Sequence, residues 1–222
     1  MEGMTLPTTA EIADRYGALR QRLDAIGGPD VAVMAVTKGF EPIVAQRAID
    51  AGCTMLGENY AQELEMKAAV IGNLPAGVGW HFIGRLQRNK VRRIADVVRR
   101  WDSVDRLSVA AEIAKRAPDA AVLIQVNVSG EPGKGGCEPE ETAALVDAVT
   151  REGLRVEGLM TVGRTGDPEG ARPGFRLLRR LCDELDLAEC SMGMTGDFEV
   201  AVAEGATIVR VGTGLFGARP SR

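Results

Sequence analysis

The chain has 222 residues, of which 45% are hydrophobic, and a formal net charge of −4. This length supports one domain with a well-filled core, so we treat residues 1–222 as a single domain. A negative net charge gives no global attraction for nucleic acid or anionic membranes. Because no apolar stretch approaches the length of a membrane span, we expect neither kind of partner.

The cysteine and histidine content predicts no metal site. The chain has one histidine, His81, and four cysteines without CxxC spacing: Cys53, Cys137, Cys182 and Cys190. These are too few and too scattered for a zinc site, and they are typical of reduced thiols. The first residues, Met1-Glu2-Gly3-Met4, lack a basic region followed by an apolar one, so we expect no secretory signal and a cytoplasmic location.

Strand and helix patterns alternate along the first half of the chain. Apolar residues on one face between Ile12 and Ile26 predict an N-terminal helix that ends at Gly27-Gly28-Pro29. Beyond it, the pattern predicts strands over 31–36, 54–56, 79–84 and 101–104, with helices over 41–49, 91–98 and 110–117.

The alternation continues to the end of the chain. We expect strands over 121–128, 154–160, 189–192 and 207–211, with helices over 138–151, 167–185 and 197–204. Eight strand–helix units in about 220 residues predict a (β/α)₈ TIM barrel with an extra N-terminal helix. A doubly wound open sheet shows the same alternation. In the barrel, the site lies at the carboxyl ends of the strands, and phosphate often binds after strands seven and eight.

Lys38 follows the first predicted strand, in the segment Val36-Thr37-Lys38-Gly39. A lysine in this position is either an ordinary surface charge or an amine held at the rim of a site. The pKa of a lysine falls on burial, and a sheltered amine can attack a carbonyl and form a Schiff base. Lys38 is therefore our candidate for covalent chemistry.

The end of the last predicted strand has the composition of a phosphate cup. Gly212-Thr213-Gly214 offers backbone N–H groups and one hydroxyl, and Ser191 could add a second hydroxyl. Arg210 points to the same side as Gly212, and its partner is either a ligand atom or a carboxylate elsewhere. The run 212–217 also matches GxGxxG, but only five residues follow it, too few for the helix and acidic residue of a dinucleotide site.

Other polar residues leave alternatives open. Asn59 follows the second predicted strand, and His81 lies within the third, either as a packed ring or as a neighbour of the site. A basic cluster consists of Arg85, Arg88, Lys90, Arg92 and Arg93. Because no aromatic residues interleave with it, we interpret it as a solvated helix face or as phosphate contacts at the site rim, not as a nucleic-acid interface.

Several motifs occur in one order along nearly the whole chain. They are Val36-Thr37-Lys38, Gly57-Glu58-Asn59-Tyr60, Trp80-His81-Phe82-Ile83-Gly84, Leu86-Gln87-Arg88-Asn89-Lys90, Gln125-Val126-Asn127, Gly158-Leu159-Met160, Ser191-Met192-Gly193-Met194, Val209-Arg210-Val211-Gly212-Thr213 and the closing residues 215–219. In these motifs the chain resembles the pyridoxal 5′-phosphate (PLP) homeostasis proteins, single-domain relatives of the alanine racemase N-terminal barrel.

The resemblance implies a role for each candidate residue. It implies PLP held covalently as a Schiff base on Lys38. The phosphate would be held by Ser191 with Gly212 and Thr213, and Arg210 would face the pyridine nitrogen. Asn59 and His81 would lie near the ring. The chain departs from the family at Arg85 and Arg88, where proline and serine are frequent, and at Gly163, where proline is frequent; these positions belong to the rim.

The resemblance also favours a carrier over an enzyme. An arginine opposite the ring nitrogen disfavours its protonation and so weakens carbanion chemistry. Racemase relatives bring a tyrosine base from a second domain, whereas this chain has only Tyr16 and Tyr60. We expect a monomeric PLP carrier that buffers PLP or delivers it to apo-enzymes, without strong catalytic activity. The alternatives are a PLP-dependent amino-acid racemase and a barrel enzyme that acts on a phosphorylated metabolite.

Overall fold

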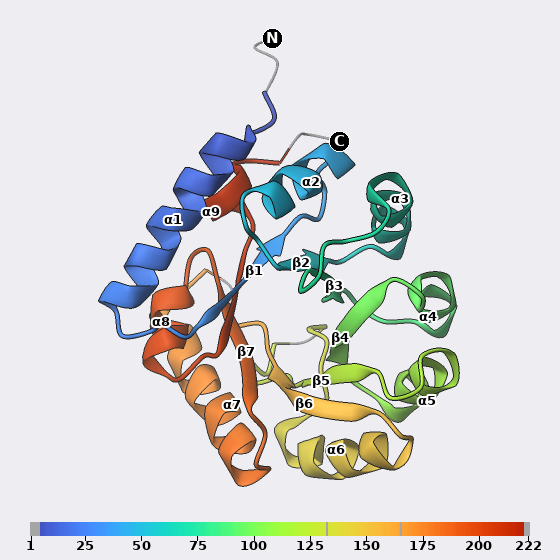
Figure 1. Ribbon diagram of the computed structural model, residues 1–222. Helices are drawn as coiled ribbons and strands as arrows, with labels where there is room; N and C mark the ends of the chain where they lie inside the picture. The colour runs from blue at the N-terminus through green and yellow to red at the C-terminus, as the bar shows by residue number, and fades with distance from the viewer. Residues whose placement is uncertain (1–4, 132, 165, 220–222) are drawn as a thin grey trace.

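Eight parallel strands form a closed barrel. The computed structural model describes residues 5–131, 133–164 and 166–219. The strands are β1 (Ala32–Val36), β2 (Met55–Glu58), β3 (Gly79–Phe82), β4 (Val98–Val104), β5 (Ala121–Gln125), β6 (Arg155–Met160), β7 (Glu189–Met194) and β8 (Ile208–Val211). They are ordered β1 to β8 around the barrel, and β8 pairs with β1 (Figure 1). This closure confirms the predicted (β/α)₈ barrel and excludes the open sheet.

Helices surround the barrel. They are α1 (Thr9–Ala25), α2 (Pro42–Asp50), α3 (Ala61–Ile71), α4 (Arg88–Ile94), α5 (Leu107–Arg116), α6 (Thr142–Arg151), α7 (Arg172–Glu184), α8 (Phe198–Ala203) and α9 (Thr213–Phe216). Short 3₁₀ turns at Pro139–Glu141 and Glu169–Ala171 precede α6 and α7. In the part of the chain that the structure describes, no helix combines the length and apolarity needed to cross a membrane.

The extra N-terminal helix is present as predicted. Thr8 caps α1, because the N–H of Glu11 donates to its hydroxyl while the Glu11 carboxylate accepts from the Thr8 N–H, a reciprocal capping box. On the outside of the barrel, α1 lies beside α2 and α9 (Figure 1). Helix α1 therefore packs against α9, the short helix that follows the last strand of the barrel.

Side chains alternate between the inside of the barrel and the layer between strands and helices. Val33 and Ala35 of β1 belong to the apolar core under the helices. Met34 points into the barrel, where a Cβ added at Gly57 would lie 2.8 Å from its sulfur. Gly57 thus leaves room for Met34 inside the barrel, below the carboxyl ends of the strands.

Helix α3 was not predicted, and its burial explains why. Its buried residues are Ala61, Leu64 and the charged Lys67, whereas Met66 and Val70 are exposed. An amphipathic pattern depends on apolar residues facing inward. Here a lysine occupies the inner face and two large apolar residues the outer one, so the helical period is hidden in the sequence.

Other boundaries also differ from the prediction. The strand predicted over 121–128 ends at Gln125 as β5, and the strand predicted over 79–84 ends at Phe82 as β3. Val98 was assigned to a helix over 91–98, but α4 ends at Ile94 and Val98 begins β4, where it pairs with Trp80. Barrel pairing therefore overrides the helical spacing of this valine. In addition, the short helix α9 lies within the GxGxxG run, where no helix was expected.

Candidate functional site

A pocket of about 280 Å³ lies at the carboxyl ends of β1, β7 and β8. Its lining residues are Val36, Lys38, Ile83, Met194, Thr195, Gly196, Arg210, Gly212, Thr213 and Arg219. The volume is close to the lower end of the range of about 300–1,000 Å³ that is usual for small-molecule sites. The pocket brings together four of the predicted site residues: Lys38, Arg210, Gly212 and Thr213.

Lys38 lies in a turn that continues β1. The N–H of Thr37 donates to Gly57 of β2 at 3.0 Å, and the N–H of Phe40 donates back to the Thr37 carbonyl at 3.2 Å. Gly39 closes the turn with φ +77°, a left-handed conformation that glycine adopts without strain. This geometry brings the half-buried Lys38 side chain to the pocket instead of leaving it on the outer surface.

The Lys38 amine is easier to deprotonate than an ordinary lysine. Burial lowers its pKa, and the positive charges of Arg219 and Arg210 lower it further, although Glu58 acts in the opposite direction. A neutral amine is the nucleophilic form of lysine. The electrostatics of the pocket therefore favour attack by Lys38 on a carbonyl.

Arg210 lies within β8, and among the described residues its guanidinium donates to neutral groups alone. Nη1 donates to the carbonyl and hydroxyl oxygens of Ser191 at 2.9 and 2.8 Å, and Nη2 donates to the Thr161 carbonyl at 2.6 Å. Burial lowers the pKa of Arg210 to about 10, so the group stays charged at neutral pH. Within residues 5–131, 133–164 and 166–219 it forms no ion pair with a carboxylate. The carboxylate partner considered as one alternative is therefore not found.

The loops after β7 and β8 offer a set of unused hydrogen-bond donors. The N–H groups of Thr195, Gly196, Gly212 and Thr213 donate to no acceptor among the described residues. A Cβ added at Gly196 would meet no atom within 4 Å. Two threonine hydroxyls and several free N–H groups around an open space suit an anion such as phosphate.

Ser191, predicted to hold the phosphate, is engaged with Arg210 inside the barrel. Its side chain is fully buried, and its hydroxyl accepts from Arg210. It does not line the pocket, whereas Thr195, four residues further on, does. The reason is that Ser191 lies within β7, while Thr195 lies in the loop beyond the strand, where the anion donors are exposed.

Asn59 lies directly after β2 and has an unused acceptor. Its side-chain Oδ1 is buried and accepts no hydrogen bond from the described residues. Its backbone oxygen is so close to Gly84 that a Cβ there would lie at 1.9 Å. Asn59 is not part of the pocket lining, but it lies between pocket-lining segments that end β1 and β3. An unpaired buried acceptor is costly, so this oxygen is available to a ligand donor.

His81 is directed to the opposite end of the barrel. It lines a separate cavity of about 360 Å³ at the amino ends of the strands, together with Arg99, Arg100 and Glu157. Its Nδ1 lies 3.4 Å from Oδ1 of the buried Asp102. The structure therefore does not bring His81 to the Lys38 pocket, because its position in β3 places the ring toward the strand starts.

Sequence reasoning missed Thr195 and Arg219 as site residues. Arg219 closes the last motif of the chain, and a Cβ added at Gly39 would lie 3.1 Å from its Cδ. It therefore covers the turn that carries Lys38 and adds a positive charge to the pocket. A threonine next to a glycine after the seventh predicted strand was the signal in the sequence that could have identified Thr195.

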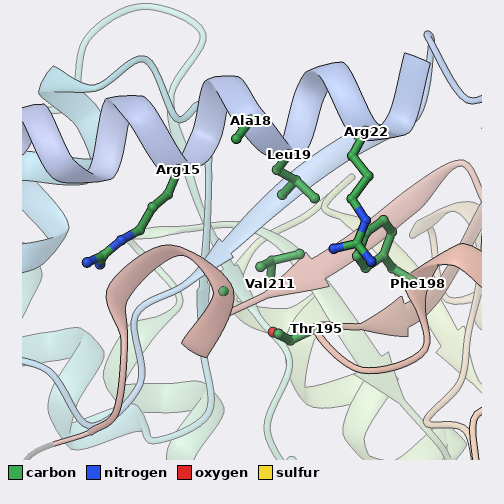
Figure 2. A pocket seen from close by; sticks show the side chains of 8 residues that line it. Arg15, Ala18, Leu19, Arg22, Thr195, Phe198 and Val211 are labelled. Carbon is green, nitrogen blue, oxygen red and sulfur yellow. The ribbon is translucent and has the colours of Figure 1, made fainter. Parts of the chain in front are cut away.

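Another hollow, of about 230 Å³, lies under α1 and is lined partly by Thr195 and Gly214 of the segments after β7 and β8 (Figure 2). Its two arginines are already engaged. Arg15 donates to the Leu215 carbonyl at 3.0 Å, and Arg22 pairs with Glu199 at 2.8 Å while lying over the Phe198 ring. These contacts attach α1 to the end of the barrel. Because both arginines already have partners, this hollow is a poorer anion site than the Lys38 pocket.

The basic cluster forms ion pairs with neighbouring helices. Arg92 pairs with Glu112 of α5 at 2.8 Å, and Arg93 pairs with Glu65 of α3. Arg88 lies 3.7 Å from Glu112. The arginines are exposed and link α4 to α3 and, through the buried carboxylate of Glu112, to α5, which supports the interpretation as a solvated helix face.

Comparison with known proteins agrees with this geometry. The family model for the alanine racemase N-terminal domain matches residues 9–220, which places the chain in that class of barrels. A pyridoxal phosphate homeostasis protein of Pseudomonas aeruginosa is 41% identical, with 96% of this chain and 97% of the relative covered. One of Aquifex aeolicus is 44% identical, covering 84% and 86%.

A solved structure with PLP bound is also similar. It is PipY of Synechococcus elongatus, with a TM-score of 0.83, 32% identity, and 93% of this chain and all of that chain covered. The chain belongs to the pyridoxal phosphate homeostasis protein family.

Proposed function

We propose that the protein holds PLP reversibly on Lys38 and buffers it or delivers it to apo-enzymes. The observation that carries this proposal is the convergence of an amine of lowered pKa and a set of unused anion donors in one pocket. The names of the relatives and the PLP-bound PipY structure support the choice of ligand.

The residues present fit PLP. Lys38 would hold the aldehyde group, and the loops at Thr195–Gly196 and Gly212–Thr213 would hold the phosphate. Arg210 would donate toward the ring nitrogen, and the unpaired Oδ1 of Asn59 would accept from a ring substituent. When bound, PLP supplies a reactive aldehyde on an electron-withdrawing ring.

The same residues argue against strong catalysis. Strong electron withdrawal needs a protonated ring nitrogen, and the positively charged Arg210 opposes that protonation. The two tyrosines do not supply a second base, because Tyr16 packs on the core from α1 and Tyr60 lies 47% exposed at the start of α3. Neither lines the pocket.

Reversible binding also requires that solvent can reach Lys38 through the opening of the pocket. Met194 at the rim is 39% exposed, and Lys38 is only half-buried. Water and a competing amine can therefore reach the attachment point, which suits a carrier that releases its ligand.

Borohydride reduction of the PLP-loaded protein followed by peptide mapping tests the proposal. We expect one pyridoxyl adduct, on Lys38, and a visible absorption band that is absent from Lys38→Ala. An adduct on another residue, or no adduct, would overturn the proposal. Transfer is tested by mixing loaded protein with an apo PLP enzyme and measuring recovered activity.

A PLP-dependent racemase is the second candidate, supported by the fold alone. It requires steady-state turnover of an amino acid that Lys38→Ala abolishes. We expect no such turnover across a panel of amino acids. We also propose that the protein is a monomer, so light scattering should give a mass near 23.6 kDa.

A further inference from the structure

A buried ion pair lies directly behind the Lys38 turn. Lys67 of α3 and Glu58 at the end of β2 have fully buried side chains, and Lys67 Nζ lies 2.5 Å from Glu58 Oε1. Burying two charges costs desolvation, so such a pair contributes little to stability compared with apolar residues. Its position next to the site therefore suggests a role other than stability.

The pair is bonded to the residue before Lys38. Lys67 Nζ donates to the Thr37 carbonyl at 2.7 Å, and the Thr37 hydroxyl donates to Glu58 Oε1 at 2.6 Å. Both polar ends of Thr37 are thus held by the same two buried side chains.

The residue after Lys38 is held by the same group of side chains. The N–H of Gly39 donates to Glu63 Oε2 at 2.7 Å, and this oxygen lies 4.0 Å from Lys67 Nζ. Gly39 has φ +77° and, as glycine, a wide choice of conformations. Without these contacts the turn would sample other shapes, and the Lys38 amine would move with it.

We propose that Lys67 is a positioning residue that acts with Glu58 and Glu63, through Thr37 and Gly39, to hold the Lys38 amine toward the anion cradle. This inference rests on the proposed function, because it concerns how fast Lys38 reacts with PLP. In that reaction the Lys38 nitrogen bonds to the aldehyde carbon, the nitrogen loses its protons, and the aldehyde oxygen leaves as water.

Positioning and capture involve different parts of the chain. The cradle lies in the loops after β7 and β8, whereas Lys67 contacts the turn after β1 and residues of β2 and α3. Removing Lys67 should therefore slow the covalent step and leave the initial capture of the phosphate unchanged. A general loss of structure would change both.

Stopped-flow absorbance after mixing apoprotein with PLP measures both quantities. The limiting rate at high PLP reports the covalent step, and the half-saturating concentration reports capture. We expect Lys67→Met to lower the limiting rate about tenfold or more, as is typical when a reacting group loses its orientation. The half-saturating concentration should stay within about twofold of wild type. Lys115→Met, the same change at an exposed lysine of α5, should match the wild type.

A second pair of variants tests the contact between Gly39 and Glu63. It also tests the positioning role if Lys67→Met does not fold. Glu63→Gln keeps an oxygen that can accept from the Gly39 N–H, whereas Glu63→Ala removes it. We expect a slower covalent step in Glu63→Ala and a rate near wild type in Glu63→Gln.

Unchanged limiting rates in Lys67→Met and Glu63→Ala would overturn the positioning role while leaving the proposed function intact. Equal losses in Glu63→Gln and Glu63→Ala would also overturn it. A wild-type protein that forms no adduct at all would overturn the proposed function itself, and this inference with it.

Discussion

Arg210 and Ser191 form one buried unit inside the barrel, with the guanidinium donating to both the hydroxyl and the carbonyl of the serine. This relationship separates the roles of two residues that the family resemblance placed on the same ligand. The Ser191 hydroxyl is engaged with Arg210, whereas Thr195 and Thr213 line the pocket.

The first prediction concerns Ser191→Ala. The change removes a hydrogen bond to a buried charged group, so we expect the free energy of unfolding to fall by about 1.5–3 kcal/mol. Affinity for PLP should change little. Denaturant unfolding and PLP titration measure the two effects, and Ser108→Ala on the exposed surface of α5 is the control. A large loss of PLP affinity at unchanged stability would restore Ser191 as a phosphate ligand.

The second prediction concerns the cradle threonines. Thr195→Val and Thr213→Val keep the shape of the side chain but remove its hydroxyl. Because a hydrogen bond to a charged acceptor contributes about 1.5–3 kcal/mol, each should weaken PLP binding about tenfold or more. Pyridoxal, which lacks the phosphate, should bind both variants as it binds the wild type. Equal weakening for both ligands would contradict a phosphate cradle at these residues.

The third prediction concerns the pH dependence of Lys38. Burial and the charges of Arg219 and Arg210 lower the pKa of this amine, so its neutral, reactive form is present at lower pH than in a surface lysine. The rate of PLP attachment should rise with pH and level off below the usual lysine range. Arg219→Gln removes one positive charge, which raises the pKa of Lys38 and moves the profile to higher pH. Initial rates across a pH series measure this, and a shift to lower pH would contradict it.

The fourth prediction concerns the charged network at the amino ends of the strands. Asp102 accepts from Arg100 at 2.9 and 3.1 Å and lies beside His81. Burial alone would raise the pKa of Asp102, but His81 and Arg100 outweigh burial and lower it. A carboxylate with a lowered pKa stabilises the fold above its unfolded pKa, and that contribution is lost as pH falls through the folded value.

Asp102→Asn should therefore destabilise the protein at neutral pH by about 3–5 kcal/mol, because it leaves the Arg100 charge without its main partner. The difference from wild type should shrink in acid. Chemical unfolding at several pH values measures this. PLP attachment to the folded variant should change little, since His81 and Arg100 line a cavity separate from the Lys38 pocket and Asp102 forms no ion pair with Arg210 among the described residues, acting on its charge only through space. A specific loss of attachment would instead connect His81 and Asp102 to the site.

Most of the architecture was predictable from the sequence. Continuous apolar runs such as 31–36 and 121–124 predict strands that are buried on both faces. Their alternation with helical patterns can be read from the order of residues alone. The location of Lys38, Gly212 and Thr213 was also predictable, because residues within two positions of the end of a barrel strand lie at the carboxyl end of the barrel, where these three line one pocket.

Tertiary structure decided what the local pattern could not. Helix α3 buries Lys67 because two residues of other elements supply its partners, Thr37 from 30 positions earlier and Glu58 from the end of β2. Ser191 and Thr195 differ by four residues, yet only barrel closure makes one a support for Arg210 and the other a wall of the pocket. His81 turned toward Asp102 for the same reason. Periodicity tells which residues are buried, whereas the direction of a polar side chain depends on partners that only the closed barrel brings within hydrogen-bond distance.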